Sequence, residues 1–447
     1  MAYGFEIGRL PPAARGLRLR EAERANLALR PRPERDAPDS GASRSAIQTC
    51  PEIECVRSRL PPRVIAEAEA RAQKVGVGVD RVLIDAGVIS EEDYIRALAQ
   101  WLHVPFEALD DMPRELCPLS DAALLQCART PILPVELGDG PARVVAPRGM
   151  AARLFVKAAR SHASLPFVRL TTPGALTRFL ARYGAQALGH AATESLDRRY
   201  PMLSSAPRSV PRAVWAAPLL GALALVAALK PALLAAGAAL ALSGLFIGWT
   251  LLRLLCLFTP VEPAQQAPPL SDAELPLYTV IVALYREASS ARALVAALKG
   301  LDYPPEKLDI KFAVEPDDRE TRAALESLAL GPRFEIVVAP DAGPRTKPKA
   351  LNAALAFAHG DLAVIYDAED RPEADQLRRA AAMFAASDTS LACVQAALTI
   401  DNTRDSWLAA LFTAEYAGHF DVLLPGLAAR DLMMPLGGSS NHFRGIR

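Results

Sequence analysis

The sequence predicts an α/β protein whose doubly wound, mainly parallel sheet follows a transmembrane helical hairpin and a small α+β domain. Two patterns predict this fold class. Between residues 276 and 395, apolar runs of strand length alternate with helical patterns, as they do when helices connect parallel strands. Upstream, residues 213–229 and 231–252 form two uncharged apolar runs, each near the roughly 17–25 residues that cross a hydrocarbon core.

Composition excludes several classes of protein. The 447 residues carry 50 Lys and Arg against 50 Asp and Glu, a formal net charge of +0, so bulk charge gives no support to nucleic-acid binding. The six cysteines form no CxxC pair, which favours reduced or buried thiols of a cytosolic protein over a disulfide framework. With six histidines and no HExxH, a zinc site is not expected.

Composition also divides the chain into segments. Arg and Pro are frequent in residues 1–54 and apolar periodicity is weak, which predicts a disordered tail; the start lacks the basic region and apolar core of a signal peptide. The other predicted segments are a small α+β domain at 55–185, a linker at 186–212, two transmembrane helices at 213–257, a Pro-rich linker at 258–275 and a partial α/β domain at 276–447.

The segment 55–185 contains one well-marked helix and two strands. Ser90 precedes three acidic residues and a run with helical apolar spacing that ends near Leu102, which is the pattern of a capped helix. Residues 132–137 and 142–146 have strand composition and flank a turn at Gly138-Asp139-Gly140, as in a hairpin.

The run from Asp85 to Gln100 resembles the N-terminal domain of type II secretion ATPases. Some members of that family bind cyclic di-GMP, so the resemblance implies this nucleotide as a partner. Val79-Asp80-Arg81 stands near the place where the family has Arg-Leu-Gly, and the alternative is a docking or packing module. The chain contains no GxxxxGK[ST] motif, so the ATPase engine of that family is absent.

The two apolar runs at 213–257 predict a hairpin through a bilayer. Lys230-Pro231 separates them and suits a tight turn, because Lys can snorkel and Pro can begin a helix. Basic residues lie on both flanks: Arg198, Arg199, Arg208, Arg212 and Arg253. The positive-inside rule then places both soluble parts in the cytoplasm, which predicts a multi-pass protein of the bacterial inner membrane. The alternative is a buried hairpin in a soluble core.

The segment 276–447 reads as alternating strands and helices. Strands are expected at 278–284, 310–314, 334–338, 362–366 and 391–395, and helices at 291–298, 319–330, 349–358 and 376–386. No GxGxxG follows the first strand, which disfavours a dinucleotide-binding Rossmann domain.

Acidic residues follow two of these strands. The second strand ends in Glu315-Pro316-Asp317-Asp318 and the fourth in Asp367-Ala368-Glu369-Asp370, and ligands of open α/β sheets bind at the carboxyl ends of strands. Asp367 and Glu369 are two residues apart, so both can face one side. Such oxygen ligands suit Mg²⁺ or Mn²⁺ bridging a diphosphate. The alternative is solvated loop acids or helix N-caps.

A basic run lies between the two acidic clusters, from Arg345 to Asn352. Basic side chains at a helix N-terminus can hold a phosphate or orient an acidic cluster. The alternative is an ordinary basic helix start, which the helix dipole mildly disfavours.

The two acidic clusters and the basic run, taken in order with two further motifs, resemble membrane-bound, cellulose-synthase-like glycosyltransferases of family 2. The two further motifs are Val280 to Glu287 and Gly437 to Phe443. The resemblance implies a GT-A-like fold, an inverting transfer from a nucleotide-diphospho-sugar to a glycan acceptor, and a divalent metal. The implied donor-binding residues are Glu315, Asp317, Asp318, Lys347, Lys349 and Asn352, the metal ligands Asp367 and Glu369, and the acceptor-side loop residues Asn441 and His442.

One part of the family pattern is missing. Family members continue to a Thr-Glu-Asp motif, whose Asp is the general base, and to Gln-x-x-Arg-Trp, and neither string occurs in the 447 residues. We therefore expect donor binding with impaired transfer and assign no catalytic base. The alternative is a non-catalytic regulatory or scaffolding membrane protein, with a degenerate transferase domain and a cyclic-dinucleotide sensor.

Overall fold

The computed structural model describes residues 5–9, 50–138, 140–161, 165, 167–204, 212–261 and 267–445. The chain separates into two compact units. We call residues 9–192, 267–394 and 442–447 the sheet unit, and residues 1–8, 193–266 and 395–441 the helical unit. Most of the predicted disordered tail at 1–54 lies outside the described residues, which include a short strand, β1 (Phe5–Arg9).

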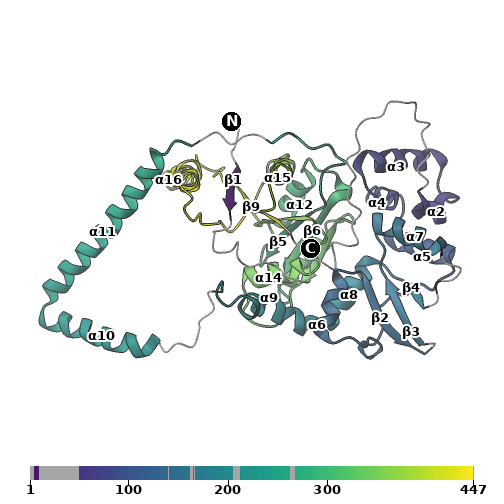
Figure 1. The fold of residues 1–447 in the computed structure, drawn as a ribbon, viewed down its shortest axis with the longest axis horizontal. Coiled ribbons are helices and arrows are strands. Elements are labelled where there is room, and N and C mark those ends of the chain that lie inside the picture. Colours follow the sequence, from purple (N-terminus) through teal and green to yellow (C-terminus); the bar gives the residue numbers. More distant parts are fainter. Residues whose placement is uncertain are drawn as a thin grey trace. The chain divides into compact units, whose positions relative to one another are not determined.

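Four parallel strands form the centre of the sheet unit (Figure 1). They are β5 (Tyr278–Leu284), β6 (Leu308–Val314), β7 (Phe334–Val338) and β8 (Leu362–Tyr366). The order of the whole sheet is β1-β9-β10-β8-β5-β6-β7, and β9 (Leu391–Ala396) and β10 (Asn441–Arg444) each cross the boundary between the two units. The predicted strands and the parallel sheet are confirmed.

Helices connect these strands as the sequence predicts. They are α12 (Ala291–Lys299), α13 (Arg319–Glu326), α14 (Lys347–Leu355) and α15 (Gln376–Ala386). Three helix boundaries differ from the prediction by two residues or more, and one of them is the end of α14, at Leu355 rather than residue 358. α13 ends four residues early, before Ala329 takes a left-handed φ of 41°, and α14 begins at Lys347 because Pro348 is accepted in the first turn of a helix.

The N-terminal part of the sheet unit, residues 50–192, combines helices with a three-stranded sheet of order β2-β3-β4. The strands are β2 (Ile132–Leu137), β3 (Gly140–Val145) and β4 (Val168–Leu170), and β2 and β3 form the predicted antiparallel hairpin. The longer helices are α3 (Pro62–Val75), α4 (Val79–Asp85), α5 (Glu91–Leu102), α7 (Met150–Ser161), α8 (Pro173–Tyr183) and α9 (Ala185–Arg199). Ser90 caps α5 by accepting from the Asp93 amide at 3.0 Å, as predicted.

The N-terminal part and the parallel sheet share one hydrophobic core. Phe179 and Leu188 belong to the same buried cluster as Ile281 of β5 and Phe357, which follows α14. Residues 186–212 were predicted to be a linker, but their first half is helix α9, whose Leu188 and Ala192 are buried in this core. Residues 50–192 are therefore packed onto the sheet as part of one unit.

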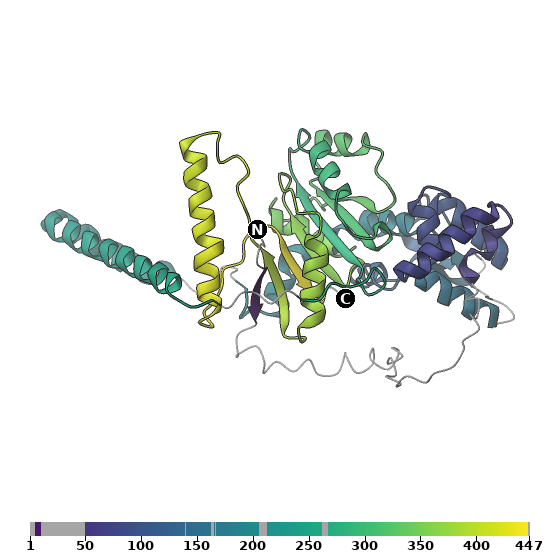
Figure 2. The same ribbon diagram turned by 90° about the horizontal axis from the view of Figure 1, so that it is seen from above.

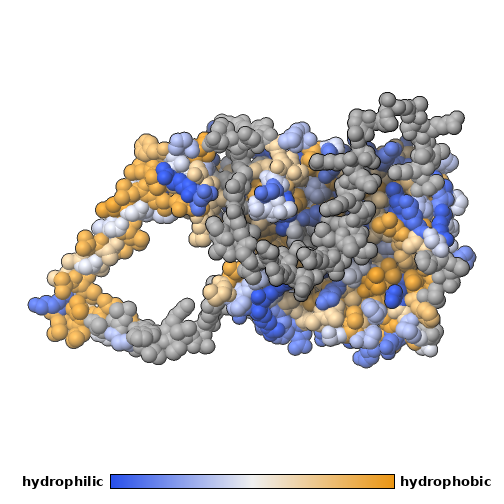
Figure 3. All heavy atoms as spheres, viewed as in Figure 1, coloured by the Kyte–Doolittle hydropathy of each residue, from blue (hydrophilic) through white to orange (hydrophobic). Residues whose placement is uncertain are grey.

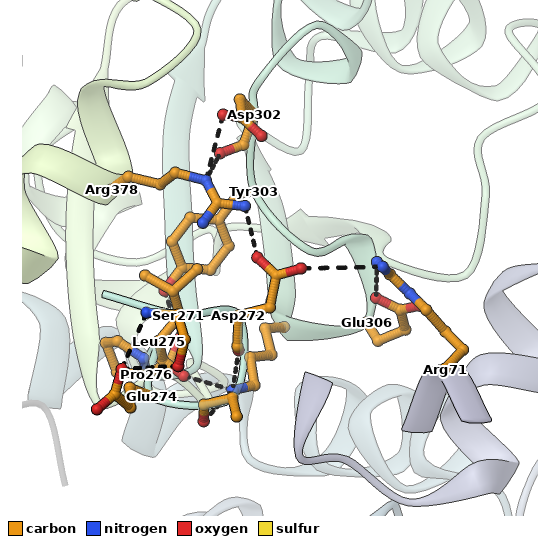
Figure 4. Close-up of polar contacts among 12 residues, drawn as sticks. Arg71, Ser271, Asp272, Glu274, Leu275, Pro276, Asp302, Tyr303, Glu306 and Arg378 are labelled. Atoms are coloured by element: carbon orange, nitrogen blue, oxygen red, sulfur yellow. Dashed lines mark hydrogen bonds and ion pairs between the residues drawn. The ribbon is translucent and has the colours of Figure 1, made fainter. Parts of the chain in front are cut away.

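Polar contacts join the two parts at a second place (Figure 4). Arg71 of α3 makes two hydrogen bonds to the buried Glu306, at 2.9 and 3.2 Å. Asp272 lies between Arg71 and Arg378 of α15, and pairs with Arg378 at 2.7 Å. The Lys307 ammonium donates to the carbonyl oxygens of residues 272, 273 and 275 at 2.6–2.9 Å. The segment that leads into β5 is therefore held from both sides.

The helical unit contains one candidate membrane span. Among the described residues, only α11 (Pro231–Leu257) is long and apolar enough to cross a membrane, and its exposed side chains are mostly apolar (Figure 3). The preceding helix, α10 (Arg212–Leu229), has 18 residues and contains Pro218. The structure thus supports one apolar span, and the predicted two-helix hairpin is not shown.

The C-terminal end of α11 packs against a second helical segment, α16 (Trp407–Ala417), a π-helical turn (Gly418–Leu423) and α17 (Leu424–Ala428), as Figure 2 shows. Cys256 of α11 and Leu424 of α17 are buried together. A Cβ placed on Gly426 would lie 2.4 Å from the Cβ of Cys256, so the close approach of the two helices requires glycine there.

Candidate functional site

The acids after β6 lie in three different environments. Glu315 is buried, and its carboxylate accepts from the Lys349 ammonium at 2.9 Å. Asp317 is exposed and pairs with Arg345 at 2.7 Å. Asp318 is buried and caps α13 by accepting from the Thr321 amide at 3.1 Å. The three acids therefore divide into a buried ion pair, an exposed ion pair and a helix cap.

Hydrogen bonds keep Asp318 ionised. Burial alone disfavours its charge, but the amides of Arg286 and Thr321 and the Thr321 hydroxyl outweigh burial and hold the pKa of Asp318 below its ordinary value. Arg286 reaches this carboxylate from a left-handed φ of 60°, a conformation that non-glycine residues adopt at a cost. The loop after β5 is thus fixed to the loop after β6.

The acids after β8 are more open. Asp367 is half-buried and pairs with Lys347, while its amide donates to Asp370 at 2.8 Å. Glu369 is exposed. The predicted metal ligands are thus one half-buried acid with a cationic partner and one acid at the surface.

The first turn of α14 brings the two acidic clusters together. Lys347 pairs with Asp367 after β8, and Lys349 pairs with Glu315 after β6. Since β6 and β8 both flank β5, the tips of these strands are about 10 Å apart. The basic run that the sequence places between the acidic clusters therefore connects them in space.

Two further residues extend the site: Arg345, which begins the predicted basic run, and Tyr285, to which we assigned no role. The Arg345 guanidinium contacts Asp317, which raises the pKa of Arg345, and the Tyr285 hydroxyl lies 3.5 Å from the Asp317 carboxylate. Tyr285 follows the first strand directly, so its place at a strand end was the signal that could have identified it. The site carries cationic and acidic groups in close pairs, an arrangement that a phosphate-bearing ligand can reorganise.

Three predicted residues lie away from these pairs. The Asn352 amide nitrogen donates to the carbonyl oxygen of Ala192 in α9 at 2.8 Å. In the helical unit, the Asn441 amide nitrogen donates to Gly437 at 2.6 Å. In the sheet unit, His442 is fully buried, 2.6 Å from the Tyr278 hydroxyl, and burial lowers its pKa to about 3. Direct contact of His442 with an acceptor would require this side chain to become exposed.

No ready-made metal centre exists among the residues that the structure describes, since no three His, Cys, Asp or Glu side chains gather as ligands there. Mg²⁺ and similar ions are nevertheless often held by one or two carboxylates plus the phosphates of a substrate. Asp367 fits such a role, provided that Lys347 turns away from it.

Comparison with known proteins identifies the domain that carries this site. Residues 276–444 match the model of the family described as glycosyltransferase-like family 2. Residues 276–444 are a family 2 glycosyltransferase domain. This segment, which we call the transferase domain, contains all the acids and lysines described above.

One curated relative is an N-acetylglucosaminyltransferase of Rhizobium meliloti (strain 1021), which is 29% identical over 164 residues. The match covers 35% of this chain and 37% of the relative, so the chain spans little more than a third of that protein's length.

Similar solved structures include a mannosyltransferase from Pyrobaculum calidifontis in complex with GDP-Man and Mn²⁺, with 26% identity, a TM-score of 0.29, and coverage of 38% of this chain and 48% of that one. Another is S. aureus TarS 1–349 in complex with UDP-GlcNAc, with 22% identity and a TM-score of 0.22. That match covers 24% of this chain and 31% of the TarS chain.

Proposed function

We propose that the protein transfers a sugar from a nucleotide-diphospho-sugar to a glycan acceptor with inversion, at the cytoplasmic face of a bacterial inner membrane. The observation that carries the proposal is the pair of α14 lysines, which reach the acids after two strands that flank β5. The first donor to test is UDP-N-acetylglucosamine, because the curated relative is named an N-acetylglucosaminyltransferase.

Side chains of the site can bind the sugar donor. Lys347 and Arg345 are partly exposed cations that can exchange a carboxylate partner for a donor phosphate. Asp317, next to the Tyr285 hydroxyl, supplies an acceptor for the donor's ribose or base. The acceptor hydroxyl bonds to the anomeric carbon as the bond to the diphosphate breaks, and a base must take the hydroxyl proton; we assign no residue to that step.

A divalent cation would be held by Asp367, with Glu369 next to it, together with the donor phosphates. When bound, Mg²⁺ or Mn²⁺ supplies positive charge that steadies the departing diphosphate. The residues around Asp367 then bind and orient the donor, and Lys347 neutralises the carboxylate until the donor arrives.

Calorimetry on the full chain in detergent tests the proposal. UDP-N-acetylglucosamine should bind in the presence of Mn²⁺, and Asp367→Asn should weaken binding about tenfold or more, since hydrogen bonds to charged groups contribute about 1.5–3 kcal/mol. Glu320→Gln is a matched control, because this exposed acid lies in the first turn of α13. Absence of binding to the unmodified protein, or equal affinity of the Asp367→Asn variant, would refute the donor site.

Membrane attachment is the second part of the proposal, and α11 supports it as a candidate span. In the same unit, α16 exposes Trp407, Leu411 and Phe412, at 79%, 57% and 52%, and a lipid bilayer would cover such side chains. We expect the expressed protein to stay with the membrane pellet after alkaline extraction. Recovery in the supernatant would contradict a spanning helix, whether the chain crosses once or as the predicted hairpin.

A ligand-sensing role of residues 50–192 is a second candidate function, and Arg81 favours it. Its terminal guanidinium nitrogens are buried and have no hydrogen-bond partner among the described residues. Burial, with Arg148 nearby, lowers the pKa of Arg81 to about 10. A buried guanidinium of this kind suits an anionic ligand, and the resemblance to secretion-ATPase domains suggests cyclic di-GMP. Calorimetric titration with cyclic di-GMP tests it, and no binding, or equal binding by Arg81→Met, would exclude this role.

A further inference from the structure

We propose that α9 is a positioning element of the donor site: it supports the loop after β7 and α14, and so sets the places of Lys347 and Lys349. This inference rests on the proposed function, because it concerns binding of the same donor. It assigns to the N-terminal part of the chain a contribution to an activity whose family match begins at residue 276.

The first contact is between α9 and the loop of residues 339–346, which joins β7 to α14. A Cβ placed on Gly189 would lie 2.6 Å from the Cβ of Ala342 and 3.7 Å from Pro340. The backbone of α9 therefore lies directly against this loop. Glycine is required at position 189 by the close approach, since the residue is within a regular helix.

The second contact is between α9 and α14. The Asn352 amide nitrogen donates to the Ala192 carbonyl oxygen at 2.8 Å. Beneath this bond, Leu188 and Ala192 pack in the same core as Ala350 and Ala353. α9 thus contacts both the loop before α14 and the body of α14.

The lysines lie between these two contacts. Lys349 is on the buried side of α14 and donates to Pro340 at 3.2 Å as well as to Glu315 at 2.9 Å. Pro340 therefore has its ring next to Gly189 and its carbonyl oxygen in a hydrogen bond with the Lys349 ammonium. Lys347, two residues earlier in the same turn, pairs with Asp367. A shift of α9 would reach both pairs through Pro340 and the first turn of α14.

The rest of the N-terminal part limits how far α9 can retreat. The pair of Arg71 with Glu306 holds α3 to the segment before β6 (Figure 4), and Arg333 lies 3.7 Å from Asp85 of α4. An added methyl group on Gly189 must move about 0.8 Å, from 2.6 Å to the 3.4 Å of ordinary contact. With α3 and α4 anchored, the loop of residues 339–346 takes up part of that movement.

Gly189→Ala in the full-length protein tests the inference, with UDP-N-acetylglucosamine and Mn²⁺ as the probe. We expect the dissociation constant to rise about tenfold or more, because the loss of one hydrogen bond to a charged group has an effect of this size. Ala342→Gly added to Gly189→Ala removes the clashing methyl group and should restore affinity. Gly331→Ala is the control, because a Cβ there meets no atom within 4 Å.

The outcomes separate the two proposals. If the unmodified protein does not bind the donor, the proposed function fails. If it binds and Gly189→Ala binds equally well, or Ala342→Gly does not restore the loss, the positioning role of α9 is wrong. Should Gly189→Ala not fold, Asn352→Ala replaces it, because this variant loses the hydrogen bond to α9. Asn352→Ala combined with Arg71→Ala must then weaken donor binding more than Asn352→Ala alone, and an unchanged dissociation constant in both variants overturns the inference.

Discussion

His442 should make the stability of the protein depend on pH. This imidazole is fully buried against Tyr278, and burial lowers its pKa to about 3 from an ordinary value of 6.5. The unfolded chain therefore takes up the proton more readily than the folded chain, so stability is lost as the pH falls below 6.5. Each pH unit below that value costs about 1.4 kcal/mol, so pH 5 costs about 2 kcal/mol.

Urea unfolding of the full chain in detergent, followed by circular dichroism at pH 7.5 and pH 5, measures this cost. The free energy of unfolding should fall by about 2 kcal/mol more in the unmodified protein than in His442→Leu, because the variant lacks only this titrating group. His190→Gln is the control, since His190 is exposed on α9. Equal losses in the protein and in His442→Leu would refute the reasoning.

Two further predictions concern buried contacts, one an ion pair and the other a close approach of two helices. Lys349→Met leaves the buried Glu315 without its partner, which should lower the free energy of unfolding in urea by about 3–5 kcal/mol. Adding Glu315→Gln to this variant should recover most of the loss. A loss below about 1 kcal/mol, the size expected for an exposed ion pair, would contradict this. Gly426→Ala places a methyl group against Cys256, and overpacking costs about 1–3 kcal/mol. Its melting temperature should fall below that of Gly418→Ala, where a Cβ meets no atom within 4 Å, and equal melting temperatures would count against the close contact.

The sequence predicted the parallel sheet and its acidic edge because both depend on local pattern. Strand composition and the acids that follow each strand are adjacent along the chain, as in Val314-Glu315 and Tyr366-Asp367. The partners of these acids were not predictable individually, because Lys347 and Lys349 could each reach either cluster until the register of β6, β5 and β8 was known.

The shared core could not be read from the sequence. Helix α9 buries only Leu188, Gly189 and Ala192, so its apolar pattern is too narrow to stand out from a linker. The role of Asn352 was also invisible, because its partner is a backbone carbonyl 160 positions away. Contacts of this kind depend on tertiary packing.

The core is continuous across residues 109–192 and 281–357, which has a practical consequence for work on the transferase domain in isolation. A fragment that starts after α11 would uncover Ile281, Ala313 and Phe357 and expose an apolar patch to water. We expect such a fragment to aggregate when it is expressed. For the same reason, exchange of residues 50–192 for another domain would also require changes to the apolar side chains of residues 281–357 that pack against them.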